Sequence, residues 1–322
     1  MKNSAETVVP IYLCCDENYA PQLCTVAASV VDNTLSPLHF IVLTAGLSDS
    51  AKSNIAKACG ANEVSFVSVA EYSRFFDEFP LLHSHISIAT CYRYLIPLLD
   101  FPYEKGIYLD CDVVVCGDIR ELFDYDISDA AIAGADDFIS TSHPKTLGLD
   151  RYFNAGVLLL NIKKMRAQNA AVKLLEKTLE LREKIKYLDQ DVLNVFFKGE
   201  SKILPPKFGA VSSLYRKNVV SEYFSAEEIR AAVYSPIVVH FTGPDKPWLI
   251  PFGITAHPWT PLFLHYWKTT AYADLLANAV EKFNPVGRFF WYWKRHLGFF
   301  LRPQFFRMRK LYARNLKKYE NK

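Results

Sequence analysis

Short apolar runs alternate with amphipathic stretches along the chain up to residue 199. Continuous apolar runs predict buried strands, and apolar residues recurring with a period near 3.6 predict helices. This alternation is typical of an α/β fold with a largely parallel sheet. Beyond residue 199 the pattern loosens, apart from an apolar strand that ends at His240. The predicted strands are 8–15, 39–43, 64–69, 106–115, 130–135 and 153–161, and the predicted helices are 19–33, 49–59, 87–98, 163–186 and 189–197.

Two aspartates interrupt the apolar strand predicted at 106–115. Residues two apart on a strand point to the same side, so Asp110 and Asp112 aim two carboxylates at one point while Cys111 faces away. Two unpaired charges this close are costly unless something positive lies between them, and a divalent cation is the simplest candidate. A polar strand end is the competing interpretation, and the spacing alone does not decide, because the chain holds two further Asp-x-Asp pairs. They are Asp124/Asp126 and Asp189/Asp191.

The composition is that of a globular protein. Half of the 322 residues are apolar and 22% are charged, which allows one large or two medium domains. The seven cysteines all precede residue 117 and form no Cys-x-x-Cys, which favours reduced, mostly buried thiols of a cytoplasmic protein. The N-terminus lacks the apolar stretch of a signal peptide, and no window approaches the length of an apolar membrane span.

The net charge of +3 is unevenly distributed. Residues 285–322 hold eleven Lys/Arg and one acid, a net of +10, so the other 26 basic and 33 acidic residues leave −7. Aromatic residues alternate with these bases, and Phe305, Met308, Tyr312 and Tyr319 recur at helical spacing. Such a segment suits an anionic membrane surface. We predict a globular domain at 1–284 and a membrane-association segment at 285–322. The alternative is a helix packed on that domain, and no recognition module supports nucleic-acid binding.

A polar turn follows the apolar strand that ends at His240. Gly243 allows close backbone approach, and Lys246 offers a point charge suited to phosphate. Two carboxylates with an imidazole suit Mn²⁺ better than Mg²⁺, which prefers all-oxygen shells. Such a metal would bridge a diphosphate and neutralise its charge as it leaves. The competing interpretation is a histidine satisfied within the core.

Polar side chains also follow the first strand and precede later elements. Asp16 and Asn18 could read a nucleobase edge with Tyr19 stacked on it, or one of them could cap the next helix. Ligands of open α/β sheets bind beyond the carboxyl ends of strands, where Asp16, Asp110 and Asp112 fall. The pair Asn154 and Ala155 could likewise be a simple strand start. Asp189, next to Gln190, could cap the helix that runs to Phe197, with the acids Asp189 and Asp191 favoured by the helix dipole.

Taken together, six segments in order resemble family 8 of the retaining glycosyltransferases, especially bacterial lipooligosaccharide and lipopolysaccharide glucosyl- or galactosyltransferases. The segments are 16–20, 85–93, 108–112, 153–157, 189–191 and 240–248. The resemblance implies a single nucleotide-binding, Rossmann-like domain of the GT-A type with a mostly parallel mixed sheet. It also implies transfer of galactose or glucose from a UDP-hexose to a lipid-linked saccharide acceptor, with an alpha linkage, at the cytoplasmic face of the bacterial inner membrane.

The resemblance assigns a role to each motif. Its implied Mn²⁺ ligands, with Mg²⁺ as a possible substitute, are Asp110, Asp112 and His240. Its implied uridine site is Asp16, Asn18 and Tyr19, and its diphosphate clamp is Gly243 with Lys246. Its implied donor-sugar pocket is Arg93, Asn154, Ala155, Asp189 and Gln190. Asp136 resembles a sugar-contacting acid, with Asp137 as a rival. Gln190 lies where a nucleophile is expected, but an amide is a poor one, so same-face attack assisted by the leaving phosphate is preferred over double displacement.

Two other classes compete with this interpretation. A haloacid-dehalogenase-type phosphatase also carries an apolar strand followed by Asp-x-Asp, which would make Asp110 a phosphorylated nucleophile and Asp136-Asp137 the later acid pair. That motif usually opens its fold, whereas about a third of this chain precedes Asp110. A non-catalytic, membrane-associated scaffold is the third class, and the intact set of ligand candidates argues against it.

Overall fold

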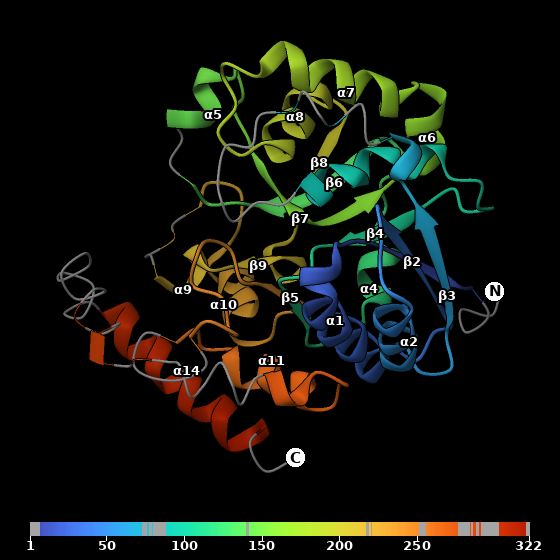
Figure 1. Ribbon diagram of the computed structural model, residues 1–322. Helices are drawn as coiled ribbons and strands as arrows, with labels where there is room; N and C mark the ends of the chain where they lie inside the picture. The colour runs from blue at the N-terminus through green and yellow to red at the C-terminus, as the bar shows by residue number, and fades with distance from the viewer. Residues whose placement is uncertain are drawn as a thin grey trace.

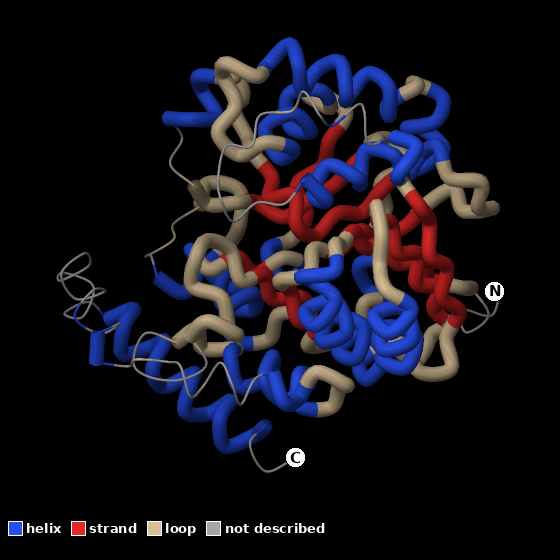
Figure 2. The backbone as a smooth tube through the Cα atoms, viewed as in Figure 1, coloured by secondary structure: helices blue, strands red, loops and turns tan. Residues whose placement is uncertain are grey.

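The computed structural model of the protein describes residues 7–72, 88–139, 142–216, 221–250, 256–275 and 303–319, with residues 76, 79, 219, 284, 286, 287 and 290. A seven-stranded sheet crosses the middle of the molecule with helices on both faces (Figure 1). A smaller, three-stranded sheet lies beside it (Figure 2). The prediction of an α/β fold with a mostly parallel mixed sheet is therefore confirmed.

The large sheet has the strand order β3-β2-β1-β4-β7-β6-β8. Strands β3, β2, β1 and β4 are parallel, and β7 runs antiparallel to both β4 and β6. This reversal brings the start of β7 to the edge where β1 and β4 end. The strands are β1 (Val9–Cys14), β2 (Leu38–Thr44), β3 (Glu63–Ser68), β4 (Gly106–Leu109), β6 (Ile132–Asp136), β7 (Phe153–Leu160) and β8 (Ser201–Leu204).

Alternate residues of the central strands pack into two different layers. Ile11 and Leu13 of β1 join the core under α1 (Ala20–Asn33) and α2 (Asp49–Ala58). Tyr12 and Cys14 join the opposite core, under the 3-10 helix η3 (Ile88–Leu98), α7 (Ala170–Leu181) and α8 (Asp189–Phe196). Burial on both faces explains why these strands read as continuous apolar runs. The remaining short elements of this region are η1 (Glu17–Tyr19), η2 (Ala70–Tyr72), α4 (Arg120–Phe123), α5 (Ser142–Thr146) and α6 (Ile162–Ala167).

Two helix predictions need correction. The single helix predicted at 163–186 is two helices, α6 and α7, because Asn169 adopts a left-handed conformation with φ 54°. Asparagine tolerates this region, so the chain can bend without glycine while the apolar periodicity continues. Helix α8 begins at Asp189, so Leu188 rather than Asp189 occupies the cap position. Residue 87 of the helix predicted at 87–98 lies outside the described residues.

The strand predicted at 106–115 is two strands in two sheets. Strand β4 ends at Leu109, and β5 (Val113–Val115) pairs with β10 (Val238–His240), which in turn pairs with β9 (Ala210–Val211). Asp110 and Asp112 therefore lie in the turn between the sheets and not in the middle of a strand. Both halves are buried and apolar, so their sequence cannot be told from one long strand. Cys111 does face away, with Sγ 3.4 Å from the Cys14 carbonyl oxygen.

Helices from the last third of the chain cover the small sheet. Helix α14 (Pro303–Tyr319) packs on α9 (Ser213–Arg216) and α11 (Thr260–Lys268), and its Met308, Leu311, Tyr312 and Asn315 are buried. The packed-helix alternative thus describes the inner face of α14. Among the described residues no helix is both long enough and apolar enough to cross a membrane. The elements here are η4 (Pro206–Phe208), α9 (Ser213–Arg216), α10 (Ala226–Tyr234), α11 (Thr260–Lys268) and α14 (Pro303–Tyr319).

The boundary predicted between 284 and 285 remains a prediction, and most of residues 285–302 lie outside the described part of the chain. All seven cysteines are free thiols. Six are buried, and Cys116 is partly buried. This agrees with the interpretation of the cysteines as reduced, mostly buried thiols.

Candidate functional site

Four strand ends meet beside the turn at Asp110–Asp112. Strands β1 and β4 end side by side, with Leu13 opposite Leu109. The Asp110 amide donates to the Gly156 carbonyl of β7 at 2.8 Å, which continues the ladder one residue past β4. The Phe241 amide donates to the Asp112 carbonyl at 3.0 Å, just after the end of β10. Side chains distant in sequence are therefore collected at one edge, as expected for a ligand site of an open sheet.

The three predicted metal ligands come together there. Asp110, Asp112 and His240 each offer one ligand atom within 4.8 Å of the others. His240 Nε2 lies 2.9 Å from Asp112 Oδ1 and 3.9 Å from Asp110 Oδ2. Asp112 Oδ1 is nonetheless buried without a hydrogen-bond partner among the described residues. A buried carboxylate oxygen in this condition calls for an explanation, and a cation shared with His240 and Asp110 supplies one.

The orientation of His240 suits a metal ligand. Its Nδ1 lies 2.7 Å from Asn154 Oδ1, which also accepts the Gly156 amide at 3.0 Å. An amide oxygen only accepts, so Nδ1 donates to Asn154, and Nε2 is the ring nitrogen that faces the carboxylates and would ligate a cation. Metal-ligating histidines are oriented in this way by the groups behind them. Sequence reasoning assigned Asn154 to sugar contact alone and missed this contact, because 86 residues separate the partners.

Only glycine fits at position 156. A Cβ there would lie 2.1 Å from His240 Cε1 and 2.7 Å from Asp110 Oδ2. The strand therefore approaches the ligand candidates more closely than any side chain would allow. Two carboxylates and a neutral imidazole are a donor set that suits Mn²⁺, so the residues present fit a divalent cation.

Basic groups flank both carboxylates. Lys246 Nζ contacts Asp112 Oδ2 and donates to the Phe241 carbonyl at 2.7 Å. Burial alone would raise the pKa of Asp112, but Lys246 and His240 beside it hold that pKa well below its usual range. The turn that carries Lys246 passes through Gly243, whose φ of +83° is a glycine conformation.

Arg93 joins the end of β4 to the start of α8. Its side chain is 3% exposed and donates to Asp110 Oδ1 at 2.7 Å and to the Ala155 carbonyl at 2.5 Å. Its Nε lies 3.2 Å from Asp189 Oδ2. Burial raises the pKa of Asp189 to about 6, even though Arg93 acts in the opposite direction. Because Arg93 and Tyr108 both donate to Asp110 Oδ1, it is Oδ2 that faces His240.

Gln190 stands at the centre of a second set of contacts. Its Oε1 accepts the Ala155 amide at 3.0 Å and Asn154 Nδ2 at 3.1 Å, and its Nε2 donates to Asp137 Oδ2 at 3.0 Å. Asp137 is buried, which raises its pKa. Among the contacts described for Asp136 are the Phe138 amide at 2.8 Å and Arg151 at 3.7 Å. The contacts thus place the rival Asp137, and not Asp136, beside Asn154 and Gln190.

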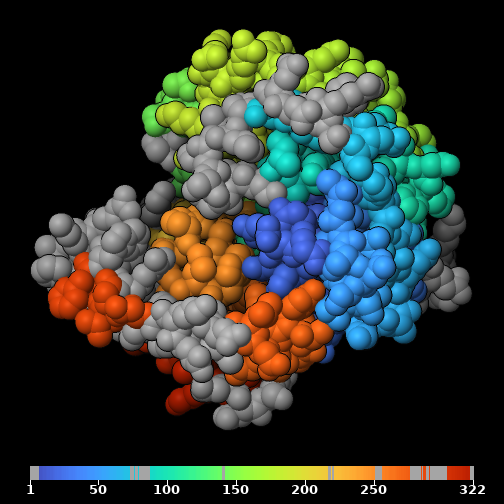
Figure 3. Space-filling view, viewed as in Figure 1, coloured from blue at the N-terminus to red at the C-terminus, as the bar shows by residue number. Residues whose placement is uncertain are grey.

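The predicted nucleotide-binding segment adjoins this site. Asp16 Oδ1 accepts the Asn18 amide at 3.0 Å and caps η1, which is the local role foreseen as the alternative. The Tyr19 ring lies edge-on to Trp248, with 6.5 Å between ring centroids. Trp248 follows the lysine turn, and Figure 3 shows the dark-blue N-terminal residues beside the orange residues near 240. The end of β1 and the turn at Lys246 are therefore neighbours.

Known proteins are similar to this chain in sequence and fold. Residues 10–250 match Glycosyl transferase family 8, and the chain belongs to this family. A Haemophilus influenzae protein named as a glycosyltransferase is 31% identical over 247 residues, 72% of this chain and 71% of that protein. The lipopolysaccharide 1,3-galactosyltransferase of Salmonella typhimurium is 31% identical over 176 residues, 50% of this chain and 49% of its own. The crystal structure of the galactosyltransferase LgtC with donor and acceptor sugar analogues superposes with a TM-score of 0.71 at 29% identity, covering 82% of this chain and 96% of LgtC.

The predicted resemblance to family 8 is thereby confirmed, although residues 85–87 of its second segment lie outside the described residues. Relatives in this family include lipopolysaccharide galactosyl- and glucosyltransferases. Nothing in the fold or in these comparisons supports the phosphatase alternative.

Proposed function

We propose that this family 8 protein is a metal-dependent, retaining hexosyltransferase. It transfers galactose or glucose from a UDP-sugar to a lipid-linked saccharide acceptor of the lipopolysaccharide or lipooligosaccharide type, forming an alpha linkage. The observation that carries the proposal is the convergence of Asp110, Asp112 and His240 within 4.8 Å, beside Lys246. The similarity to lipopolysaccharide galactosyl- and glucosyltransferases supports the donor and acceptor classes.

The leaving-group end of the site lies between the two sheets. Asp110, Asp112 and His240 Nε2 would hold Mn²⁺, or Mg²⁺ in its place, and the bound cation would neutralise the diphosphate as it departs. Lys246 adds a positive charge on the same side, where negative charge develops in the transition state. Gly243 lets the backbone approach the phosphates closely. Asp16, Asn18 and Tyr19, at the end of β1, hold the uridine.

The sugar end of the site lies along β7 and the start of α8. Its polar groups are Arg93, Asn154, Ala155, Asp189 and Gln190, joined by Asp137. Gln190 is an amide, so we favour same-face attack in which the leaving phosphate takes the proton of the acceptor hydroxyl. A Gln190→Ala variant that keeps near-normal turnover would exclude covalent participation by this side chain. A trapped covalent sugar on Gln190 would overturn same-face attack.

The membrane end of the protein is its C-terminal segment. Residues 285–322 act as a peripheral anchor on the cytoplasmic face of the bacterial inner membrane, where a lipid-linked acceptor is found. Helix α14 supports this proposal with six basic residues and no acidic one. Removal of residues 285–322 should release the protein from membranes in fractionation. A truncated protein that stays with the membrane would overturn the anchor.

Thermal unfolding with UDP and Mn²⁺ tests the catalytic proposal. Stabilisation that requires both ligands together supports the transferase. Stabilisation by inorganic phosphate analogues without UDP would favour the phosphatase class instead. Release of UDP from UDP-galactose and from UDP-glucose, measured in parallel, would then identify the hexose.

A further inference from the structure

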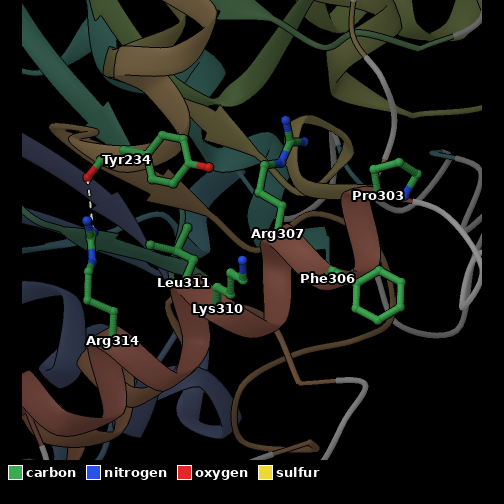
Figure 4. A pocket seen from close by; sticks show the side chains of 7 residues that line it. All are labelled: Tyr234, Pro303, Phe306, Arg307, Lys310, Leu311 and Arg314. Carbon is green, nitrogen blue, oxygen red and sulfur yellow. Dashed lines mark hydrogen bonds between the residues drawn. The ribbon is translucent and has the colours of Figure 1, made fainter.

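A groove far from the candidate active site lies between the end of α10 and the face of α14 (Figure 4). Its volume is about 700 Å³. One wall is Tyr234, the last residue of α10, and the other is the start and middle of α14. None of the residues given a role in metal, nucleotide or sugar binding lines this groove, so its chemistry needs a separate account.

Every charged side chain that lines the groove is basic. Arg307, Lys310 and Arg314 are spaced three and four residues apart, which places them on one face of α14. Arg307 donates to the Leu214 carbonyl at 3.1 Å, and Arg314 donates to the Tyr234 carbonyl at 3.2 Å. These bonds fix both guanidinium groups against the groove. Since a guanidinium carries five N–H donors, one bond to a carbonyl leaves others for a ligand.

The rest of the lining is apolar. Leu311 is 2% exposed and belongs to the core beneath the groove, whereas Phe306 is 58% exposed at its outer end. An exposed phenylalanine beside three cations matches a ligand with both an anionic group and a hydrocarbon part. A free phosphate would make no use of Phe306.

We propose that this groove binds the phosphate headgroup of an anionic membrane lipid, with the acyl chains beside Phe306. The inference rests on the proposed membrane association of residues 285–322 and makes it specific. It assigns the contact to one groove, whereas a basic helix attracted by a charged surface would use all of its bases about equally. The charge complementarity of Arg307, Lys310 and Arg314 with a lipid phosphate selects this occupant.

Two matched double variants of the full-length chain test the groove. Lys310→Gln with Arg314→Gln removes two charges that line it. Lys317→Gln with Lys318→Gln removes two charges from the same helix outside it, and both of these lysines are exposed. Binding is measured by co-sedimentation with vesicles of phosphatidylcholine and phosphatidylglycerol. The groove pair should lose at least about tenfold more affinity than the control pair, because charge-assisted hydrogen bonds add to surface attraction.

Phe306→Ala provides a second readout, since an exposed side chain can be shortened without unfolding the protein. It should weaken vesicle binding by about fivefold or more while leaving the net charge unchanged. Equal losses of affinity for the two double variants, with no effect of Phe306→Ala, would overturn the proposal that lipid binds in this groove. Binding would then be explained by non-specific electrostatic attraction of the helix to the membrane surface. If inorganic phosphate displaced the protein from sedimented vesicles as effectively as additional vesicles do, the lipid assignment would be overturned.

These outcomes are separable from the catalytic proposal. Both double variants should keep the stabilisation by UDP with Mn²⁺, because neither touches the site between the sheets. If that stabilisation is absent from the wild-type protein, the catalytic proposal fails while the vesicle comparison remains valid.

Discussion

Asp112 and Asp191 are each the second acid of an Asp-x-Asp pair, and each lies within the protein, but their surroundings differ. Asp191 is 0% exposed and accepts hydrogen bonds from the Lys186 amide at 2.6 Å, the Tyr187 amide at 3.0 Å and His143 Nε2 at 2.8 Å, as well as from the Tyr152 hydroxyl. Asp112 Oδ1 has no such set of donors and lies 2.9 Å from His240 Nε2.

The difference separates a structural carboxylate from one available to a ligand. Four donors satisfy Asp191, which thereby holds the turn before α8, including Leu188 at a φ of 41°. This turn sets the position of Asp189 and Gln190 at the start of the helix. Asp112 Oδ2 instead forms an ion pair with Lys246, and the lone pairs of Oδ1 remain available to a ligand. Several buried polar atoms lack a hydrogen-bond partner among the described residues, and Asp112 Oδ1 stands apart because Asp110 and His240 converge on it.

Substitution at Asp112 should have the largest effect on function. Asp112→Asn removes one ligand charge, and we expect transfer to fall by about 10²–10³-fold because charge stabilisation of the leaving group is lost. The stabilisation by Mn²⁺ with UDP should disappear with it. Initial rates of UDP release across a Mn²⁺ titration provide the measurement, and full Mn²⁺-dependent activity in this variant would refute the ligand assignment. Asp191→Asn is the matched control, since it should not abolish stabilisation by Mn²⁺ with UDP.

Truncation of Asp191 should have the largest effect on stability. Asp191→Ala leaves two amides, a hydroxyl and an imidazole without their acceptor, and we expect about 3 kcal/mol or more to be lost from the free energy of unfolding. Urea unfolding followed by circular dichroism measures the change. If Asp191→Ala had the same urea midpoint as the wild-type protein, the four contacts of Asp191 would contribute little to stability. The distinction between a structural Asp191 and a ligand-binding Asp112 would then not hold.

The sequence predicted the large sheet better than the small one. Strands β1 and β2 are long, doubly buried runs, so their apolar pattern located them. Strands β5, β9 and β10 have only two or three residues, too few for any periodicity, and β5 was merged with β4. The register of β6 shifts between Gly134 and Asp136, which breaks the alternation of faces. Alternation therefore could not decide between Asp136 and Asp137. The convergence of Asp110 and Asp112 was predicted from strand alternation, although both lie in a turn, and their grouping with His240 was predicted from donor chemistry and family resemblance.

A buried histidine extends the comparison to pH. His257 Nε2 is buried without a hydrogen-bond partner among the described residues, and burial holds the pKa of His257 well below its usual value. The unfolded chain protonates this histidine near pH 6.5 while the folded protein does not, so its effect on stability is absent above that pH. Below it, stability should fall by up to about 1.4 kcal/mol per pH unit.

His257→Asn should flatten this slope, because an amide oxygen can still accept the Trp259 amide but does not titrate. Urea unfolding of both proteins at about pH 5.0, 6.0 and 7.5 measures the difference in the pH dependence of the free energy of unfolding. These pH values bracket a histidine pKa of about 6.5. Identical slopes would mean that His257 is protonated in the folded state as readily as in the unfolded chain.

The third Asp-x-Asp pair should have the smallest effect. Asp124 is 56% exposed and pairs with Arg120 four residues earlier, and Asp126 Oδ1 accepts the Ser128 amide at 2.9 Å in an exposed turn. Exposed ion pairs of this kind contribute little, because water and salt screen them. We expect the double variant Asp124→Asn with Asp126→Asn to retain wild-type transfer rates, Mn²⁺ dependence and urea midpoint. A loss of Mn²⁺-dependent activity in this variant would show that Asp-x-Asp spacing, and not the unsatisfied oxygen beside a histidine, is what identifies a metal site in this chain.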